Sequence, residues 1–133
     1  MTPETDVVAR DFSIETLIAV RHEVMRWARE HGMTDPPLYR FVVAVNEIAT
    51  NAVRHGGGTG RLELWRAGDL LYCRVTDHGG GLAPDHSIEL PAPHTTSGRG
   101  LWLAREGSET MTVRREQGAT SVTLTGRPAA LSA

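Results

Sequence analysis

The stretch VNEIATNAVRH, from Val45 to His55, decides how the rest of the chain is interpreted. It spaces Glu47, Asn51 and His55 four residues apart, so their side chains lie on one stripe of a helix. Mostly apolar residues flank this stripe, and a helix that is apolar nearly all round is buried on more than one side. A carboxylate and an amide in such a wall need polar partners. We interpret the stripe as the wall of a pocket, and a solvated helix face is the alternative.

Two helices are expected around this stretch. The second begins at Asp35-Pro36, because proline is tolerated in the first turn of a helix, and the glycines at 56–58 end it. The first has an apolar stripe over residues 14–28 and Ser13 as its N-cap. Residues 1–12 have no clear period and are interpreted as a lead-in.

Alternating apolar and polar residues predict two β-hairpins after the second helix. A glycine marks each turn, Gly68 in the first hairpin and Gly118 in the second. The four strands are expected at residues 61–65, 70–76, 111–115 and 121–125.

Between the hairpins, residues 82–97 hold three prolines and little periodicity, so we expect a long, lid-like loop. A short helix is expected at residues 100–106. This order of elements predicts an α+β fold, a two-layer sandwich with helices on one face of a mixed, largely antiparallel sheet. We expect residues 1–133 to form a single domain.

The composition is that of an ordinary globular domain. Hydrophobic residues make up 40% of the 133 residues, and the net charge of −2 provides no strong field for holding a polyanion. No apolar run approaches the roughly 20 residues that span a bilayer. Cys73 is the only cysteine, which excludes an internal disulfide. We therefore expect a cytoplasmic protein that binds neither nucleic acid nor membrane directly.

Two glycine-rich segments carry further chemistry. Asp77 to Gly81, DHGGG, follows an alternating strand, and an Asp at a strand end can accept a hydrogen bond from an exocyclic amine such as that of adenine. Ser97 to Gly100, SGRG, precedes the expected short helix, where a glycine-rich turn presents N–H groups to phosphate. Each segment is weak evidence alone, since many turns and helix starts contain glycine.

Together, three segments resemble the motifs of the GHKL, or Bergerat-fold, ATPases. VNEIATNAVRH is similar to the N-box of this family, DHGGG to its first glycine box, and SGRGL, from Ser97 to Leu101, to its second. Their order and spacing agree with the family, and the resemblance covers about residues 13–125. The compact chain resembles, within the family, the actinobacterial anti-sigma-factor serine/threonine kinases of the RsbW and SpoIIAB kind.

The resemblance implies roles for residues of the first two motifs. Asn51 is expected to hold the Mg²⁺ that bridges the phosphates of ATP, and amide and carboxylate oxygens are hard ligands that suit this ion. Glu47 is expected to act as the catalytic base or to polarise the attacking group. Asp77 is expected to bind the adenine amino group, while Gly79 and Gly81 let the backbone close around the base.

The second glycine box is expected to face the phosphates. Gly98 and Gly100 would shape the hinge of the lid, in the segment that also contains Ser97, Arg99 and Leu101. His55 and Arg99 are candidates for touching phosphate, although a helix-end histidine and a solvated arginine fit equally well.

In the kinase subfamily the acceptor is a serine or threonine of a STAS-domain anti-anti-sigma factor, which competes with a sigma factor for the kinase. We expect these partners here, together with a homodimer. A switch module that binds ATP or ADP without phosphotransfer is the main alternative. A detached histidine-kinase catalytic domain is disfavoured by the missing acceptor helices, and an ATPase of the gyrase or Hsp90 type ranks last because it needs further domains.

Overall fold

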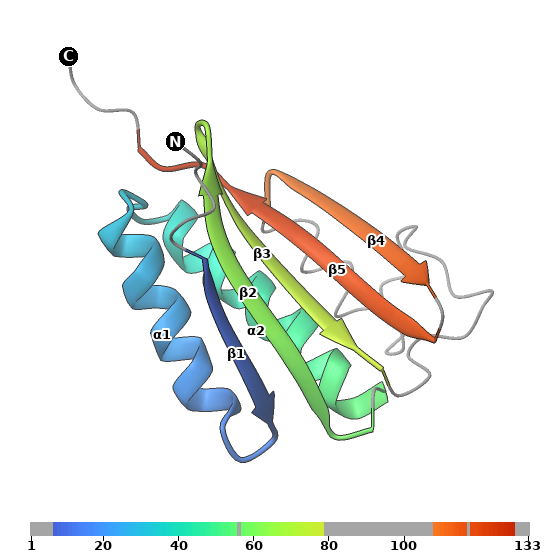
Figure 1. Ribbon diagram of the computed structural model, residues 1–133. Coiled ribbons are helices and arrows are strands. Elements are labelled where there is room, and N and C mark those ends of the chain that lie inside the picture. The colour runs from blue at the N-terminus through green and yellow to red at the C-terminus, as the bar shows by residue number, and fades with distance from the viewer. Residues whose placement is uncertain (1–6, 56, 79–107, 117, 130–133) are drawn as a thin grey trace, which may run out of the picture.

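The structure is a computed structural model that describes residues 7–55, 57–78, 108–116 and 118–129. Two helices, α1 (Leu17–Glu30) and α2 (Pro37–His55), cover one face of a five-stranded sheet (Figure 1). The strands are β1 (Val8–Ser13), β2 (Thr59–Ala67), β3 (Leu70–Asp77), β4 (Thr110–Glu116) and β5 (Ala119–Gly126). This arrangement confirms the predicted two-layer α+β sandwich.

The strands lie in the order β1-β2-β3-β5-β4, and all four pairings in the described sheet are antiparallel. Both predicted hairpins are present, with Gly68 at φ +60° in the β2–β3 turn and Gly118 at φ +82° in the β4–β5 turn. Glycine adopts this left-handed conformation without a steric cost. The expected loop at 82–97 and the expected short helix at 100–106 lie outside the described residues.

The length and hydropathy of a helix decide whether it can cross a membrane. Neither α1 nor α2, the helices of the described ranges, is both long enough and apolar enough to cross a bilayer.

The N-terminal strand corrects the expectation that residues 1–12 form a lead-in. β1 pairs with β2 along its whole length, from Val8 opposite Leu64 to Ser13 opposite Thr59. Ser13 therefore ends a strand and is not the N-cap of α1. Thr16 takes the position before the helix, and its hydroxyl accepts a hydrogen bond from the Ser13 N–H at 2.9 Å.

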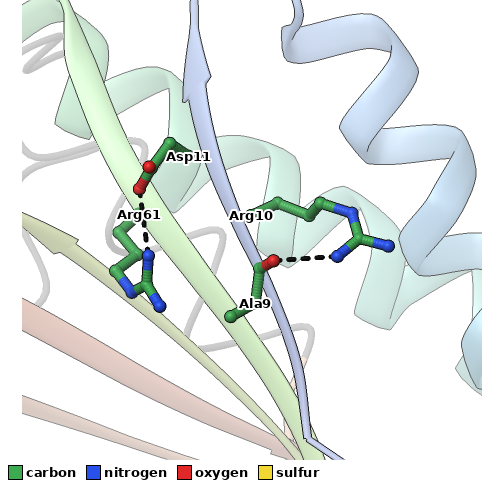
Figure 2. Close-up of polar contacts among 4 residues, drawn as sticks. All are labelled: Ala9, Arg10, Asp11 and Arg61. Carbon is green, nitrogen blue, oxygen red and sulfur yellow. Dashed lines mark hydrogen bonds and ion pairs between the residues drawn. The ribbon is translucent and has the colours of Figure 1, made fainter.

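A charged residue on the helix-facing side of β1 concealed its alternation. Arg10 lies opposite the buried Leu62, on the side of the sheet that faces the helices, and its guanidinium forms an ion pair with Glu23 of α1 at 2.8 Å. The next residue, Asp11, points the other way and binds Arg61 of β2 at 3.2 Å (Figure 2). The polar side chain at an inward position is satisfied by a residue that is distant in sequence, so no local pattern reveals the strand.

The core lies between the helices and the inward-facing residues of the central strands. In β3 the alternation is strict: Leu71, Cys73, Val75 and Asp77 are buried, and the residues between them are half-buried. Burial raises the pKa of the Cys73 thiol, and the negative charge of Glu63 raises it further, so this thiol stays protonated inside the fold. From α2 the core receives Leu38, Phe41, Val42, Ala44, Val45, Ile48, Ala49 and Ala52.

A glycine at the end of β5 sets the position of α2 on the sheet. A β-carbon added at Gly126 would lie 2.8 Å from Cδ1 of Phe41 and 3.1 Å from Sδ of Met33, both buried. Such distances are shorter than van der Waals contact, so the ring of Phe41 rests directly on the Gly126 backbone. The N-terminal half of α2 is thereby held against the end of β5.

This contact predicts that Gly126→Ala destabilises the protein. The added methyl group overpacks a filled site, which costs about 1–3 kcal/mol in the free energy of unfolding, measured by urea denaturation. Combining it with Phe41→Leu provides the control, because the smaller side chain makes room for the methyl group. The alanine should then cost less than it does in the wild-type background. An alanine that costs the same in both backgrounds would contradict the contact.

Candidate functional site

The polar stripe of α2 lies in a partly enclosed environment. Glu47 and Asn51 are half-buried, whereas Val45 and Ala49 on the opposite side of the helix are 1% and 2% exposed. Every residue of α2 from 41 to 53 is buried or half-buried, so the stripe is not a freely solvated face. This environment suits the wall of a pocket.

Asn51 lies at the edge of the side of α2 that contacts β5. Phe41, Ala44, Ile48 and Asn51 follow one another at spacings of three and four residues, which places them in one row along the helix. Phe41 begins this row and rests on Gly126 of β5. Ten residues at about 100° each turn Asn51 by about 80° around the helix axis from Phe41, so Asn51 lies at the edge of the side that contacts β5. Glu47, one turn earlier, lies about 40° farther round.

The C-terminal end of α2 and the end of β3 lie at the same end of the molecule (Figure 1). α2 ends at His55, β2 begins only four residues later at Thr59, and Arg61 near the start of β2 pairs with Thr76 near the end of β3. The short connection leaves no room for the two ends to separate.

Distances along the elements agree with this placement. Asn51 lies ten residues beyond Phe41, or about 15 Å along the helix. Thr120 lies six residues from Gly126, or about 20 Å along β5. Since Phe41 and Gly126 are in contact, Asn51 and Thr120 come to about the same level of the two-layer sandwich.

Asp77 and Thr120 are the buried polar residues at this end of the helix-facing side of the described sheet. They pair across β3 and β5, and they are 7% and 5% exposed. Arg115 of β4 follows as the partner of Thr120 in the next strand, so the row runs Asp77, Thr120, Arg115. The Asp77 carboxylate can accept a hydrogen bond from a planar, polar ligand, and the Thr120 hydroxyl can donate one to it.

Thr120 was not among the site residues expected from the sequence. The sequence does contain a signal for Thr120. Along β5, Thr120 alternates in step with the buried Val122 and Leu124, so its side chain lies on the same face as theirs, and it is the polar member of that series. Its proximity to Asp77 depends on the β3–β5 pairing, which joins residues more than 40 positions apart.

Part of the expected site lies outside the described residues. This holds for Gly79, Gly81, Ser97, Gly98, Arg99, Gly100 and Leu101. His55 is the last residue of α2, and its backbone lies at the same end of the molecule as Asp77.

The described residues allow a simple test of metal binding. They contain no cluster of three or more His, Cys, Asp or Glu side chains, which is what a fully protein-ligated metal centre requires. Glu47 and Asn51 instead offer two oxygen donors one helical turn apart in a half-buried position. Such a pair suits Mg²⁺, which is held by one or two protein oxygens together with substrate phosphates and water.

Comparisons with known proteins identify the family and the fold of the chain. A family model described as the histidine kinase-like ATPase domain matches residues 12–126. Among solved structures, the RsbU and RsbW domains of Rv1364c from Mycobacterium tuberculosis are similar over 97% of this chain, with a TM-score of 0.67 and 23% sequence identity. The chain spans 35% of that structure's length.

A second solved structure has the same fold. The histidine kinase AdeS of Acinetobacter baumannii is similar over 91% of this chain and 68% of its own, with a TM-score of 0.58 and 12% identity. No curated protein matches the chain significantly.

Proposed function

The chain belongs to the family of histidine kinase-like ATPase domains, and on that basis we propose that it is an anti-sigma-factor serine/threonine kinase that uses Mg-ATP. The observation that carries the proposal is the meeting of α2 and β3 at one end of the molecule. There the C-terminal end of α2, the helix that carries the half-buried Glu47 and Asn51, lies at the same end of the molecule as the end of β3, which carries the buried Asp77. A nucleotide fits this arrangement with its base toward the sheet and its phosphates along the helix.

Asp77 is suited to recognise adenine. Its carboxylate can accept a hydrogen bond from the exocyclic amino group of the base, and Thr120 beside it can donate to a ring nitrogen. Both side chains lie in an apolar layer, where hydrogen bonds are stronger than they are in water.

Asn51 and Glu47 are suited to the phosphate end of the nucleotide. Asn51 would hold Mg²⁺ through its amide oxygen, and the ion would supply positive charge to neutralise the phosphates. Glu47 would accept the proton of an attacking hydroxyl group or orient that group. Phosphoryl transfer needs little else from a protein, because positioning and electrostatic stabilisation account for most of its catalysis.

We assign the acceptor hydroxyl to a STAS-domain anti-anti-sigma factor, with a sigma factor as the competing partner, a homodimer as the assembly and the cytoplasm as the location. The resemblance to RsbW and SpoIIAB kinases carries these assignments. The shared fold with the RsbU and RsbW domains of Rv1364c supports them at the level of architecture.

Replacing Asp77 by Asn tests the adenine contact. The amide presents a donor in place of one acceptor oxygen, and a lost buried hydrogen bond costs about 1–3 kcal/mol, or roughly 5- to 150-fold in ATP affinity. Isothermal titration calorimetry measures this loss. Asp69→Asn, at the exposed β2–β3 turn, is the matched control and should bind normally. Unchanged ATP affinity in a folded Asp77→Asn variant would refute the adenine assignment.

Replacing Asn51 by Ala tests the magnesium contact. Because the change removes a hard oxygen ligand, it should weaken Mg-ATP binding more than the binding of ATP without metal. Titrations with and without Mg²⁺ separate the two effects. Asn46→Ala, at a half-buried position of the same helix, controls for losses in helix packing. An equal loss under both conditions would mean that Asn51 has a structural role only.

Replacing Glu47 by Gln tests catalysis. The Gln variant keeps the size of the side chain but lacks the basic oxygen, so Mg-ATP binding should stay within a few-fold while phosphotransfer falls by about 10²–10⁴-fold. Transfer of labelled phosphate to STAS-domain proteins of the same genome is the measurement, with Glu30→Gln at the end of α1 as control.

Two results of this experiment would change the proposal. Full transfer by the Gln variant would exclude Glu47 as the base. A wild-type protein that binds ATP and STAS-domain partners without transferring phosphate to any of them would be a nucleotide-dependent switch module.

A further inference from the structure

A second pocket lies at the opposite end of the molecule from Asn51 and Asp77. Its volume is about 420 Å³, and the buried Met33 and Gly126 are among the residues that line it. Gly126 pairs with Leu71 near the start of β3, so this pocket is about 20 Å from the end of that strand. It is therefore separate from the proposed nucleotide site.

The chain after β5 builds one wall of this pocket. The N–H of Ala129 donates a hydrogen bond to the carbonyl oxygen of Gly32 at 2.9 Å, which holds residues 127–129 against the turn between α1 and α2. Pro128 lies close to Gly32, since a β-carbon added at Gly32 would lie 3.3 Å from Cβ of Pro128. Both proline rings that line the pocket, Pro37 and Pro128, present rigid apolar surface.

The rim of the pocket carries an excess of positive charge. Arg127 and Glu109 form an ion pair at 3.8 Å, with side chains 55% and 48% exposed, and an exposed pair of this length is weak. Arg40 also lines the pocket, and within the described part of the chain its guanidinium has neither an ion pair nor a hydrogen bond. Among the described residues, the rim thus offers two guanidinium groups and one carboxylate.

The exposure of the rim favours a peptide over a small molecule. Small-molecule sites enclose most of their ligand, but Thr34, Pro37, Arg40, Glu109 and Arg127 around this pocket are all exposed. Glu109 would repel a multiply charged anion such as phosphate, whereas it can accept a hydrogen bond from a peptide N–H. A peptide with an acidic side chain can bind the guanidinium groups through its carboxylate and Glu109 through a backbone N–H at the same time.

We propose that this pocket binds an extended segment of a partner protein that carries an acidic side chain next to an apolar one. The carboxylate of this segment binds Arg40 and Arg127, and its apolar side chain packs between Pro37 and Pro128. Glu109 accepts a hydrogen bond from a backbone N–H of the segment. The arrangement is independent of nucleotide binding, and it gives the chain a second contact surface.

Titration of the ¹⁵N-labelled full chain with the capped tripeptide acetyl-Leu-Glu-Leu-amide tests the proposal by NMR. Saturable shifts are expected at millimolar concentrations for the backbone amides of Glu109, Arg127 and Ala129, while amides near Asn51 and Asp77 stay unchanged. The Gln analogue, acetyl-Leu-Gln-Leu-amide, should bind more weakly. Arg40→Gln should weaken binding of the acidic peptide by roughly two- to five-fold, as loss of an exposed charge pair does.

Arg26→Gln, an exposed position on α1 away from the pocket, is the matched control and should leave the binding unchanged. Equal affinity for the Glu and Gln peptides would overturn the proposal, as would the absence of shifts at the pocket. Inorganic phosphate is the third ligand to be titrated. If phosphate shifts the same amides as strongly as the acidic peptide does, the pocket is a simple anion site and the peptide proposal is wrong.

Discussion

The seating of α2 on the sheet is the constraint on which the rest of the structure depends. The helix contributes a continuous apolar row to the core, and its Phe41 rests on the backbone of Gly126, where no β-carbon could fit. Protein interiors are close-packed, so a helix held in this way cannot slide along the sheet without leaving voids. Together with the rise of the helix and of the strand, this contact brings Asn51 to about the level of Thr120.

Because α2 is packed on the sheet in this way, the polar residues around this interface lie at its two ends. Along most of its length the interface between α2 and the sheet is apolar, because a polar side chain placed there would need a partner. On the helix-facing side of the described strands, the buried polar side chains are Asp77 and Thr120, which lie side by side at the end of β3. At the other end, the connection between α1 and α2 and the chain after β5 enclose the arginine-rimmed pocket.

The outward face of the sheet is stabilised by its own cross-strand contacts. Trp65 and Tyr72 pair across β2 and β3 with their rings stacked at 5.1 Å, and the guanidinium of Arg74 lies 5.1 Å from the Trp65 ring. Arg74 also binds Glu63 at 2.9 Å. Directly opposed pairs of this kind stabilise a sheet without a helix above them, which leaves the helices free to cover the other face.

The sequence by itself determined the elements whose signals are local. α2 follows from a period of 3.6 residues bounded by proline and glycine, and both hairpins follow from alternation around Gly68 and Gly118. The Asn51 stripe became a site candidate through its four-residue spacing on a mostly apolar helix, and Asp77 through its place between a strand and a run of glycines. Only the tertiary structure decided that β1 belongs to the sheet, that β5 lies between β3 and β4, and that Thr120 lies beside Asp77. These features depend on pairings between residues far apart in sequence, such as Arg10 with Glu23 and Asp77 with Thr120, and no local period encodes them.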